Sequence, residues 1–494
     1  MPLPLPAHDE PAREDTHDWK SDYQLWLPLM LVSWALAYMF QDPFITDWDG
    51  FDYAAYAVRN VPTALGLGRA LFLAYNHVLW ELAHRWFGLP PEHAYLVLRY
   101  GVIAQSGPAV VGIYALYKEL TGHRLAALCG TLMVALSPFY IVYSGRGMSE
   151  VPAFLMFGWS LWWMVRSLRL GYLGRYIAAA ALFGASANIR EFAVFYLPLV
   201  PLAGRVYGVR WHRCLIAFGV AGLAAVAGPI FWALYEPQYY IPSVINWYRL
   251  SAKEREVHPV TVRNVWFVVA YAYACSPAAT LLVPFTFQRL RSNQRLRTLL
   301  LFGGFGLLAD LVLLANHDLS VNPRYLLTGL FGLAATSGWC LAEWIKKRSR
   351  WSILALVTLS ILTAISLVGM RQYLRGQEPA ARAARAYLSK VEGLPPHAVF
   401  IVGARTPLVN FYNSIGARPV WKTISPGSGW PDERLGAVID GYLAEGRPVY
   451  VDFDESLWPQ GMREHSREAA GLEMIKRNYQ LELVRDSLYQ VAGK

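Results

Sequence analysis

Long apolar runs separated by short polar segments dominate the chain between residues 23 and 370. A run of about 20 mostly apolar residues is long enough to cross the hydrocarbon core of a bilayer as a helix. The pattern therefore predicts a polytopic α-helical membrane protein of about eleven spans, or nine if the short pair within 176–204 does not cross. The predicted spans are residues 24–40, 95–117, 125–143, 152–165, 176–188, 192–204, 214–234, 264–288, 299–316, 325–345 and 351–370.

Residues 69–87 are also rich in apolar side chains, but polar and charged residues interrupt the run at helical spacing. A segment of this kind is typical of an amphipathic helix that lies on the membrane surface and does not cross it. The interrupting residues are Asn76, His77, Glu81, His84 and Arg85.

Charged residues are scarce and unevenly distributed. They make up 16% of the 494 residues, against about 25% in a typical soluble protein, and apolar residues make up 55%. Residues 1–22 hold 8 charges, residues 23–370 hold 42 and residues 371–494 hold 30. This distribution excludes a soluble protein and predicts a transmembrane domain at 23–370, between a polar N-terminus at 1–22 and a polar tail.

Basic residues predict the orientation of the spans. With the N-terminus in the cytoplasm, the cytoplasmic loops carry 16 basic residues among 41, and the outer loops carry 10 among 102. The positive-inside rule then predicts an integral protein of the plasma (inner) membrane, with a cytoplasmic N-terminus and an extracytoplasmic C-terminal domain. The net charge of +10 belongs to loops beside the lipid bilayer, so no nucleic-acid partner is expected.

Residues 371–494 have the pattern of a small α/β domain. Apolar segments at 398–402 and 448–452 predict buried strands, and residues 481–491 predict a final strand or hairpin. Residues 378–392 and 432–445 are expected to be helical. The Gly-, Pro- and Ser-rich segment 403–431 is either a functional loop or an ordinary connection.

Acidic residues of the membrane domain collect on the predicted outer side, which holds 12 of the 15. The densest group lies directly after the first span, in the outer loop 41–94. Like charges repel one another at the edge of a low-dielectric region, so such a group is typical of a site that binds a cation or transfers protons. Helix capping would explain one or two of these acids, and solvation of long loops is the other structural explanation. The four aspartates of the group are Asp42, Asp47, Asp49 and Asp52.

The order of motifs along residues 20–370 resembles the GT-C class of membrane glycosyltransferases, in particular the protein O-mannosyltransferases and the lipid A aminoarabinose transferases. The resemblance rests on an acidic group followed by a Tyr-Ala helix, a surface helix, a second outer loop with an acid before proline, and a late Arg-Tyr pair. The matching segments are Asp47-Trp-Asp49-Gly-Phe-Asp52-Tyr53-Ala, residues 69–87, Tyr143-Ser-Gly-Arg146-Gly-Met-Ser-Glu150-Val-Pro152 and Asn322-Pro-Arg324-Tyr325. Where the aminoarabinose transferases have Asp-Glu, this chain has Asp49-Gly50, so the second acid is Asp47 or Asp52.

The resemblance implies an inverting glycosyltransferase that moves a hexosyl or pentosyl group from a polyprenyl phosphate or diphosphate to a lipid, glycan or protein acceptor at the outer face. Asp49 is then the expected general base, while Asp47 and Asp52 orient the acceptor or bind a metal. The leaving phosphate needs positive charge placed in advance, and Arg324 is the first candidate. The expected substrate-binding residues are Tyr53, Arg324, Tyr325, Arg146, Arg190 and Arg99, and a divalent metal ion at Glu150 and His317 is the one cofactor considered.

A secondary transporter of a polar or lipid-linked substrate is the alternative from another functional class. Transporters of this kind have internal repeats, broken helices and charges near the membrane midplane. The sequence shows no repeat, and its acids crowd one face, so the glycosyltransferase is favoured. The structural explanations for single residues are an N-cap role for Asp49 and snorkelling to the interface for Arg99 and Arg324.

Overall fold

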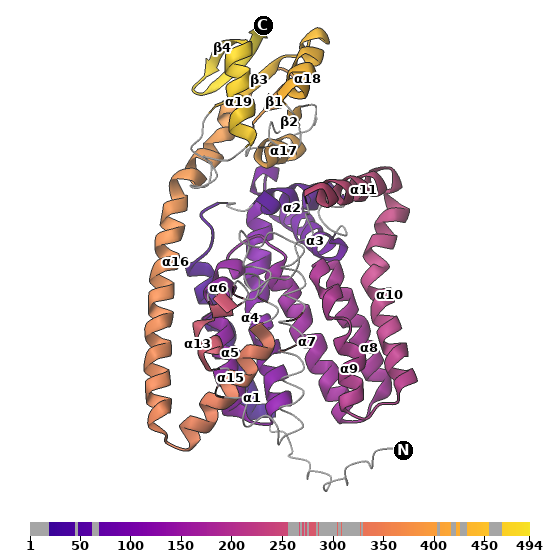
Figure 1. Cartoon of the computed structure of the whole chain (residues 1–494), viewed down its shortest axis with the longest axis vertical. Helices are drawn as coiled ribbons and strands as arrows, with labels where there is room; N and C mark the ends of the chain where they lie inside the picture. Colours follow the sequence, from indigo (N-terminus) through magenta and orange to yellow (C-terminus); the bar gives the residue numbers. More distant parts are fainter. Residues whose placement is uncertain are drawn as a thin grey trace.

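A helical bundle with a small sheet domain at one end forms the molecule (Figure 1). The computed structural model describes residues 19–44, 48–61, 69–254, 330–402, 406–415, 421–424, 432–453 and 467–494, with single residues and short pieces between 266 and 327. The helices of the bundle are α1 Trp19–Met39, α4 Ala94–Thr121, α5 Arg124–Ala135, α6 Pro138–Ser144, α7 Glu150–Arg169, α8 Leu173–Ala185, α9 Leu199–Val206, α10 Trp211–Tyr235, α13 Pro277–Leu282, α15 Leu330–Lys346 and α16 Arg350–Val391.

Three helices within the described ranges are long and apolar enough to cross a membrane: Pro91–Thr121, which includes α4, then α10 and α16. Helices α5 and α6, joined at a 65° bend, would add a fourth if together they make one span. The predicted number of about eleven spans is therefore not confirmed. The prediction that the chain is mainly helical is confirmed, however, and helices occupy most of the predicted spans among the described residues.

Two breaks in the bundle follow from local chemistry. Pro138 has no N–H to donate to a preceding turn, and the Ser137 side chain accepts a hydrogen bond from the Tyr140 N–H at 3.4 Å, so α6 starts afresh there. The range 192–204, predicted as one span, instead contains a 3-10 segment, η3 (Glu191–Tyr196), followed by the eight-residue helix α9. The Asn188 side chain stabilises this break, because it accepts a hydrogen bond from the Gly228 N–H and donates one to the Ala224 carbonyl of α10.

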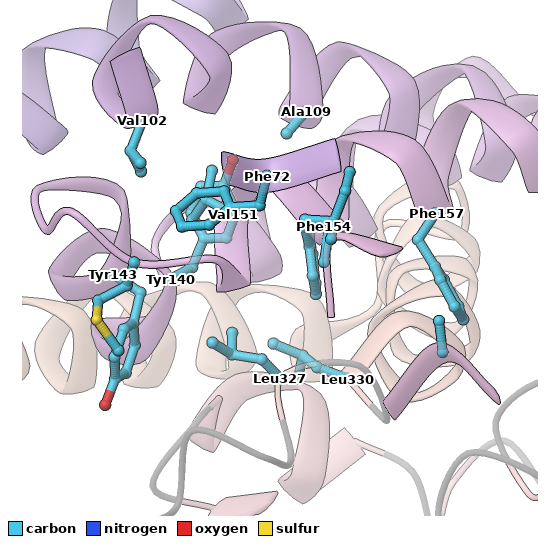
Figure 2. Close-up of a cluster of buried hydrophobic side chains, with 14 of the residues drawn as sticks. Phe72, Val102, Ala109, Tyr140, Tyr143, Val151, Phe154, Phe157, Leu327 and Leu330 are labelled. Atoms are coloured by element: carbon cyan, nitrogen blue, oxygen red, sulfur yellow. The ribbon is translucent and has the colours of Figure 1, made fainter. Parts of the chain in front are cut away.

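Aromatic and aliphatic side chains from several helices fill the centre of the bundle. Figure 2 shows Val102 and Ala109 of α4 lying opposite Tyr140 and Phe154, with Leu330 of α15 on the far side. The Phe154 ring packs against the ring of Phe331, with centroids 4.2 Å apart. Segments that are far apart in the sequence therefore share one core.

Three amphipathic helices lie at the end of the bundle nearest the sheet domain (Figure 1): α2 Trp48–Arg59, α3 Ala70–Phe87 and α11 Pro237–Glu254. Helix α3 confirms the helix predicted at 69–87, and its Trp86 and Phe87 side chains are 72% and 80% exposed, as a surface helix requires. Helix α11 lies within the predicted outer loop 235–263, which is therefore not an irregular loop throughout.

The C-terminal sheet confirms the predicted strands. Its strand order is β2 (Lys422–Ile424), β1 (Val399–Ile401), β3 (Val449–Asp452), β5 (Leu488–Gly493) and β4 (Gln480–Arg485). Strand β1 pairs in parallel with β2 and β3, whereas β5 pairs antiparallel with β3 and β4. Helices α18 (Asp432–Ala444) and α19 (Arg467–Asn478) accompany the sheet. The helix predicted at 378–392 is the end of α16, which passes through residue 371 without a break; the domain boundary placed there stays a prediction.

Helix α17 (Thr406–Ile415) connects the C-terminal domain to α2. It lies inside the Gly-, Pro- and Ser-rich segment predicted as a loop, and Phe411 of α17 is fully buried, with its ring centroid 5.9 Å from that of Phe51 in α2. The sheet domain therefore packs directly on the helix that carries the acidic residues (Figure 1).

Glycines allow α5 and α15 to approach closely, so we expect Gly338→Val to separate them. A Cβ at Gly338 would lie 2.3 Å from the Gly130 backbone nitrogen. Small residues permit such contacts between membrane helices, and overpacking of this kind costs about 1–3 kcal/mol. Thermal unfolding of the purified variant should show the loss. Gly222→Val in α10 is the matched control, because no atom lies within 4 Å of a Cβ there; equal effects of the two changes would contradict the packing argument.

Candidate functional site

Helix α2 presents Asp49, Asp52 and Tyr53 on one face, because residues three and four positions apart are neighbours on a helix. Asp49 lies in the first turn, where the helix dipole favours a carboxylate. The fully buried Tyr53 donates its hydroxyl to Asp49 Oδ2 at 3.5 Å. Both aspartates are half-buried.

Arg69 lies over this face. Its guanidinium carbon is 5.0 Å from the centre of the Tyr53 ring, and Nε and Nη2 donate to the two carboxylate oxygens of Glu191 at 3.1 and 2.9 Å. The pairing is bidentate and mostly buried, which is the arrangement in which an arginine–carboxylate pair is strongest. Arg69 also has a left-handed backbone, with φ 44°, so the ion pair offsets local backbone strain.

A second buried pair lies next to the first. Arg190 Nη1 is 2.5 Å from Glu150 Oε1, and both side chains are less than one-tenth exposed. The Ser149 hydroxyl accepts a hydrogen bond from Arg69 Nη1 and another from Arg190 Nη1, each at 3.4 Å. Ser149 thus joins the two pairs into one group, the paired-arginine cluster, which consists of Arg69, Arg190, Glu150, Glu191 and Ser149.

Electrostatic coupling connects the paired-arginine cluster to Asp49. Burial works against the charge of Arg69, but Glu191 and then Asp49 and Glu150 raise its pKa above the ordinary value. Burial likewise opposes ionisation of Glu191, yet the Arg69 and Arg190 guanidinium groups outweigh it and lower the Glu191 pKa to about 2. Glu191 and Glu150 are thus each paired with an arginine, and the Asp49 carboxylate interacts electrostatically with Arg69 as well.

Asp52 differs from the other acids. Burial, and then the negative charge of Asp49, raises the pKa of Asp52 to about 7. A carboxyl group that titrates near neutral pH can accept or release a proton under physiological conditions. The face of α2 therefore offers two carboxyl groups, one of which exchanges its proton near pH 7.

Arg99 and Arg146 do not join the paired-arginine cluster but meet around Asp42. Arg146 Nε donates to Asp42 Oδ1 at 3.1 Å, and its Nη2 donates to the Tyr373 hydroxyl of α16 at 3.3 Å. Arg99 Nη1 donates to the Asp42 backbone carbonyl at 2.5 Å. The adjoining cavity of about 10 Å³ has room for about one water molecule. This second group therefore holds the loop after α1 against α4, α6 and α16.

The remaining predicted site residues lie outside the described ranges: Asp47, His317, Arg324 and Tyr325. Within those ranges no three His, Cys, Asp or Glu side chains gather to hold a metal ion. Glu150 of the predicted metal site is paired with the Arg190 guanidinium.

The sequence analysis missed Arg69 and the role of Glu191. A signal for Arg69 was present: it directly precedes a helix, where the dipole disfavours a cation, inside the most acidic loop of the chain. A cation in that position requires an acidic partner. Glu191 was counted only as one of the twelve acids on the predicted outer side, because its partner Arg69 lies 122 residues away in the sequence.

Neither a family model nor a curated protein matches the sequence. Solved structures do match. ArnT (aminoarabinose transferase) from Cupriavidus metallidurans, bound to undecaprenyl phosphate, aligns with a TM-score of 0.58 at 12% identity, over 96% of this chain and 98% of that chain. The Archaeoglobus fulgidus oligosaccharyltransferase with Zn and sulfate aligns with a TM-score of 0.50 at 13% identity, over 86% of this chain and 68% of that chain. The oligosaccharyltransferase AglB from Archaeoglobus fulgidus, with an inhibitory peptide and a dolichol-phosphate, aligns with a TM-score of 0.51 at 12% identity, over 94% of this chain and 73% of that chain.

The chain has the GT-C fold. The resemblance inferred from the order of sequence motifs is thereby confirmed at the level of fold, although so little of the sequence is shared. Within this GT-C fold, the acidic face of α2 and the paired-arginine cluster lie at the end of the bundle nearest the sheet domain (Figure 1).

Breaking the Arg69–Glu191 pair should destabilise the protein strongly. We expect Arg69→Gln to lower the free energy of unfolding by about 3–5 kcal/mol, because it leaves a buried glutamate without its partner. Arg85→Gln is the matched control, since its pair with Glu81 is exposed and worth less than about 1 kcal/mol. Thermal unfolding of both variants measures the two losses of stability. Similar losses would contradict the prediction that the buried pair contributes more than the exposed one.

The raised pKa of Asp52 predicts a pH-dependent effect on stability. The folded state holds this proton more tightly than the unfolded state, so the stability it contributes is fully present below pH 3.8 and is lost as the pH rises through about 7. Asp52→Asn should therefore raise the unfolding temperature at pH 8 by at least about 2 °C, with little gain at pH 4. Glu92→Gln, at an exposed residue, should change it little at either pH. A pH-independent effect of Asp52→Asn would contradict the assignment.

Proposed function

We propose that this protein is an inverting glycosyltransferase that moves a sugar from a polyprenyl phosphate or diphosphate to a lipid, glycan or protein acceptor at the outer face of the membrane. The observation that carries the proposal is the position of Asp49 and Asp52 on α2, beside a buried arginine cluster that contacts Tyr53 of the same helix, in a GT-C fold. Two of the similar structures support the donor class, because ArnT is bound to undecaprenyl phosphate and AglB to a dolichol-phosphate.

Asp49 is the proposed general base. The oxygen of an acceptor hydroxyl attacks the anomeric carbon of the sugar, its proton passes to the Asp49 carboxylate, and the bond between the anomeric carbon and the phosphate oxygen breaks. Tyr53 supports this role, because its hydroxyl donates to Asp49 Oδ2 and orients the carboxylate at the start of α2. Asp52, three residues further along the same face, is placed to receive the proton or to orient the acceptor.

The leaving phosphate takes the electrons of the broken bond and needs positive charge close by. Arg69 is the cation that the contacts favour, because it lies against Tyr53 and interacts electrostatically with Asp49. Arg190 is the second cation, joined to Arg69 through Ser149. Arg324 and Tyr325 stay candidates from the sequence, whereas Arg99 and Arg146 have the positioning role described above.

A divalent metal ion stays in the proposal as the candidate cofactor, because one similar oligosaccharyltransferase structure contains Zn. No step is assigned to a metal here, because Glu150 faces Arg190 and His317 lies outside the described residues. An assay of sugar transfer with and without a chelator shows whether the reaction depends on a metal ion.

Replacement of Asp49 provides the direct test. We expect Asp49→Asn to reduce sugar transfer by about 10²–10⁴-fold, because the amide keeps the shape of the side chain but cannot accept the proton. Purified protein would be incubated with a panel of polyprenyl-phosphate and polyprenyl-diphosphate sugars, and transfer to acceptors would be followed by mass spectrometry.

Glu92→Gln is the control for this test, because Glu92 is an exposed acid of the same predicted outer loop and has no role in the proposed site. It should transfer sugar at the unmodified rate. Full activity of Asp49→Asn, with an unfolding temperature equal to that of the control, would remove Asp49 from the mechanism. Full activity of Asp49→Asn with a strong loss in Asp52→Asn would move the base to Asp52.

A further inference from the structure

The charges around Asp42 do not cancel. Arg146 Nε lies 3.1 Å from Asp42 Oδ1, and both side chains are less than one-tenth exposed. Within the described chain no ion pair joins Arg99 to an acid, and its Nη1 donates instead to the Asp42 backbone carbonyl, which carries no net charge. Two guanidinium groups and one carboxylate therefore leave this Asp42 group, which consists of Asp42, Arg99 and Arg146, with one uncompensated positive charge.

The uncompensated charge is buried. Arg99 is 8% exposed, and buried charges in proteins are normally paired with an opposite charge or an ion. The guanidinium carbon of Arg99 lies 5.9 Å from the centre of the Tyr95 ring and 5.3 Å from that of the Tyr100 ring. The faces of these rings attract a cation, but more weakly than an anion in contact with it would. Arg99 is thus a buried cation that lacks an anionic partner among the described residues.

A hydrogen-bond donor of the same side chain is also unused. Arg99 Nε is buried and has no hydrogen-bond partner within the described chain. The backbone N–H of Gly147, which lines the same cavity as Arg99, likewise has no acceptor among the described residues. Buried N–H groups nearly always have a partner, either in the protein or in an ordered water or ion. The lining of this cavity therefore calls for an acceptor that the described chain does not supply.

The cavity has the size of a single small particle. Its volume is about 10 Å³, which is enough for one water molecule and too small for phosphate or sulfate. The titratable residues of its lining are Asp42, Tyr95, Arg99 and Arg146, and the one carboxylate among them is already bonded to Arg146. A water molecule could accept the hydrogen bonds but would leave the positive charge unpaired. A chloride ion is only slightly larger than water and would satisfy both requirements.

We propose that this cavity binds one monovalent anion of the size of chloride, with Arg99 as its main partner. Arg99 Nε donates to the ion, and Arg146 on the other side of the lining adds positive charge. Gly50 in the first turn of α2 also lines the cavity, so the ion links α4 to the helix that carries Asp49 and Asp52. The proposal does not depend on the glycosyltransferase assignment, because it uses none of the residues to which a step of the reaction is assigned.

Thermal unfolding of the purified full-length chain tests the proposal. An ion that binds only the folded state raises the unfolding temperature by mass action. At about 200 mM salt, sodium chloride and sodium bromide should each give an unfolding temperature at least about 2 °C above that in sodium gluconate, whose anion is too large for the cavity. Arg99→Gln should remove this difference. Arg175→Gln is the matched control and should keep it, because Arg175 is an exposed arginine that also stacks on a ring, that of Tyr172, but does not line the cavity.

Anomalous X-ray scattering from crystals of the unmodified protein grown in sodium bromide locates the ion. A bromide peak is expected within about 3.5 Å of Arg99 Nε. Three results would overturn the proposal: equal unfolding temperatures in the three salts, an unchanged difference in Arg99→Gln, or no bromide peak in the cavity. The last result would show that the cavity holds water. If Arg99→Gln does not fold, the bromide measurement decides alone, since it needs no variant.

Discussion

The two buried arginine–glutamate pairs are the interactions on which the end of the bundle nearest the sheet domain depends. They join three segments that are distant in the sequence: the start of α3 at Arg69, the start of α7 at Ser149 and Glu150, and the break after α8 at Arg190 and Glu191. A buried ion pair gives little net stability, but removing one partner leaves an uncompensated charge at a cost of several kcal/mol. The pairs therefore specify one arrangement of these segments, and α2 rests on that arrangement through the contact of Tyr53 with Arg69.

This pairing also separates structural acids from acids that can react. Glu150 and Glu191 are engaged by arginines, and Asp42 is engaged by Arg146. Asp49 and Asp52 stay on the partly exposed face of α2, where their charges interact unfavourably. The raised pKa of Asp52 follows first from the burial of its carboxyl group and then from the negative charge of Asp49.

The sequence predicted the membrane-protein class, the GT-C fold, the surface helix α3 and the strands of the C-terminal domain, because each depends on a local or periodic pattern. It also singled out Asp49, Asp52 and Tyr53, which the structure brings together. It did not predict which acid pairs with which arginine, since Arg69 and Glu191 meet only through the fold. The sequence predicted that Arg99 and Arg146 bind substrate, but it did not predict that both contact Asp42. An arginine in a predicted outer loop has the same sequence pattern whether it binds substrate or supports the fold.

The continuity of α16 gives the C-terminal domain a defined place beside this site. Its 42 residues extend about 63 Å, roughly twice the thickness of the hydrocarbon core, so one rigid helix both runs along the bundle and carries the sheet beyond its end. Lys390 near the end of α16 bonds to Asp452 and Ser487 of the sheet region, and Arg146 of the bundle bonds to Tyr373 in the same helix. With α16 held at both points, α17 packs on α2 through Phe411 and Phe51. Helix α2 thus lies between two supports, because Arg69 of the paired-arginine cluster contacts its Tyr53 and α17 of the C-terminal domain contacts its Phe51.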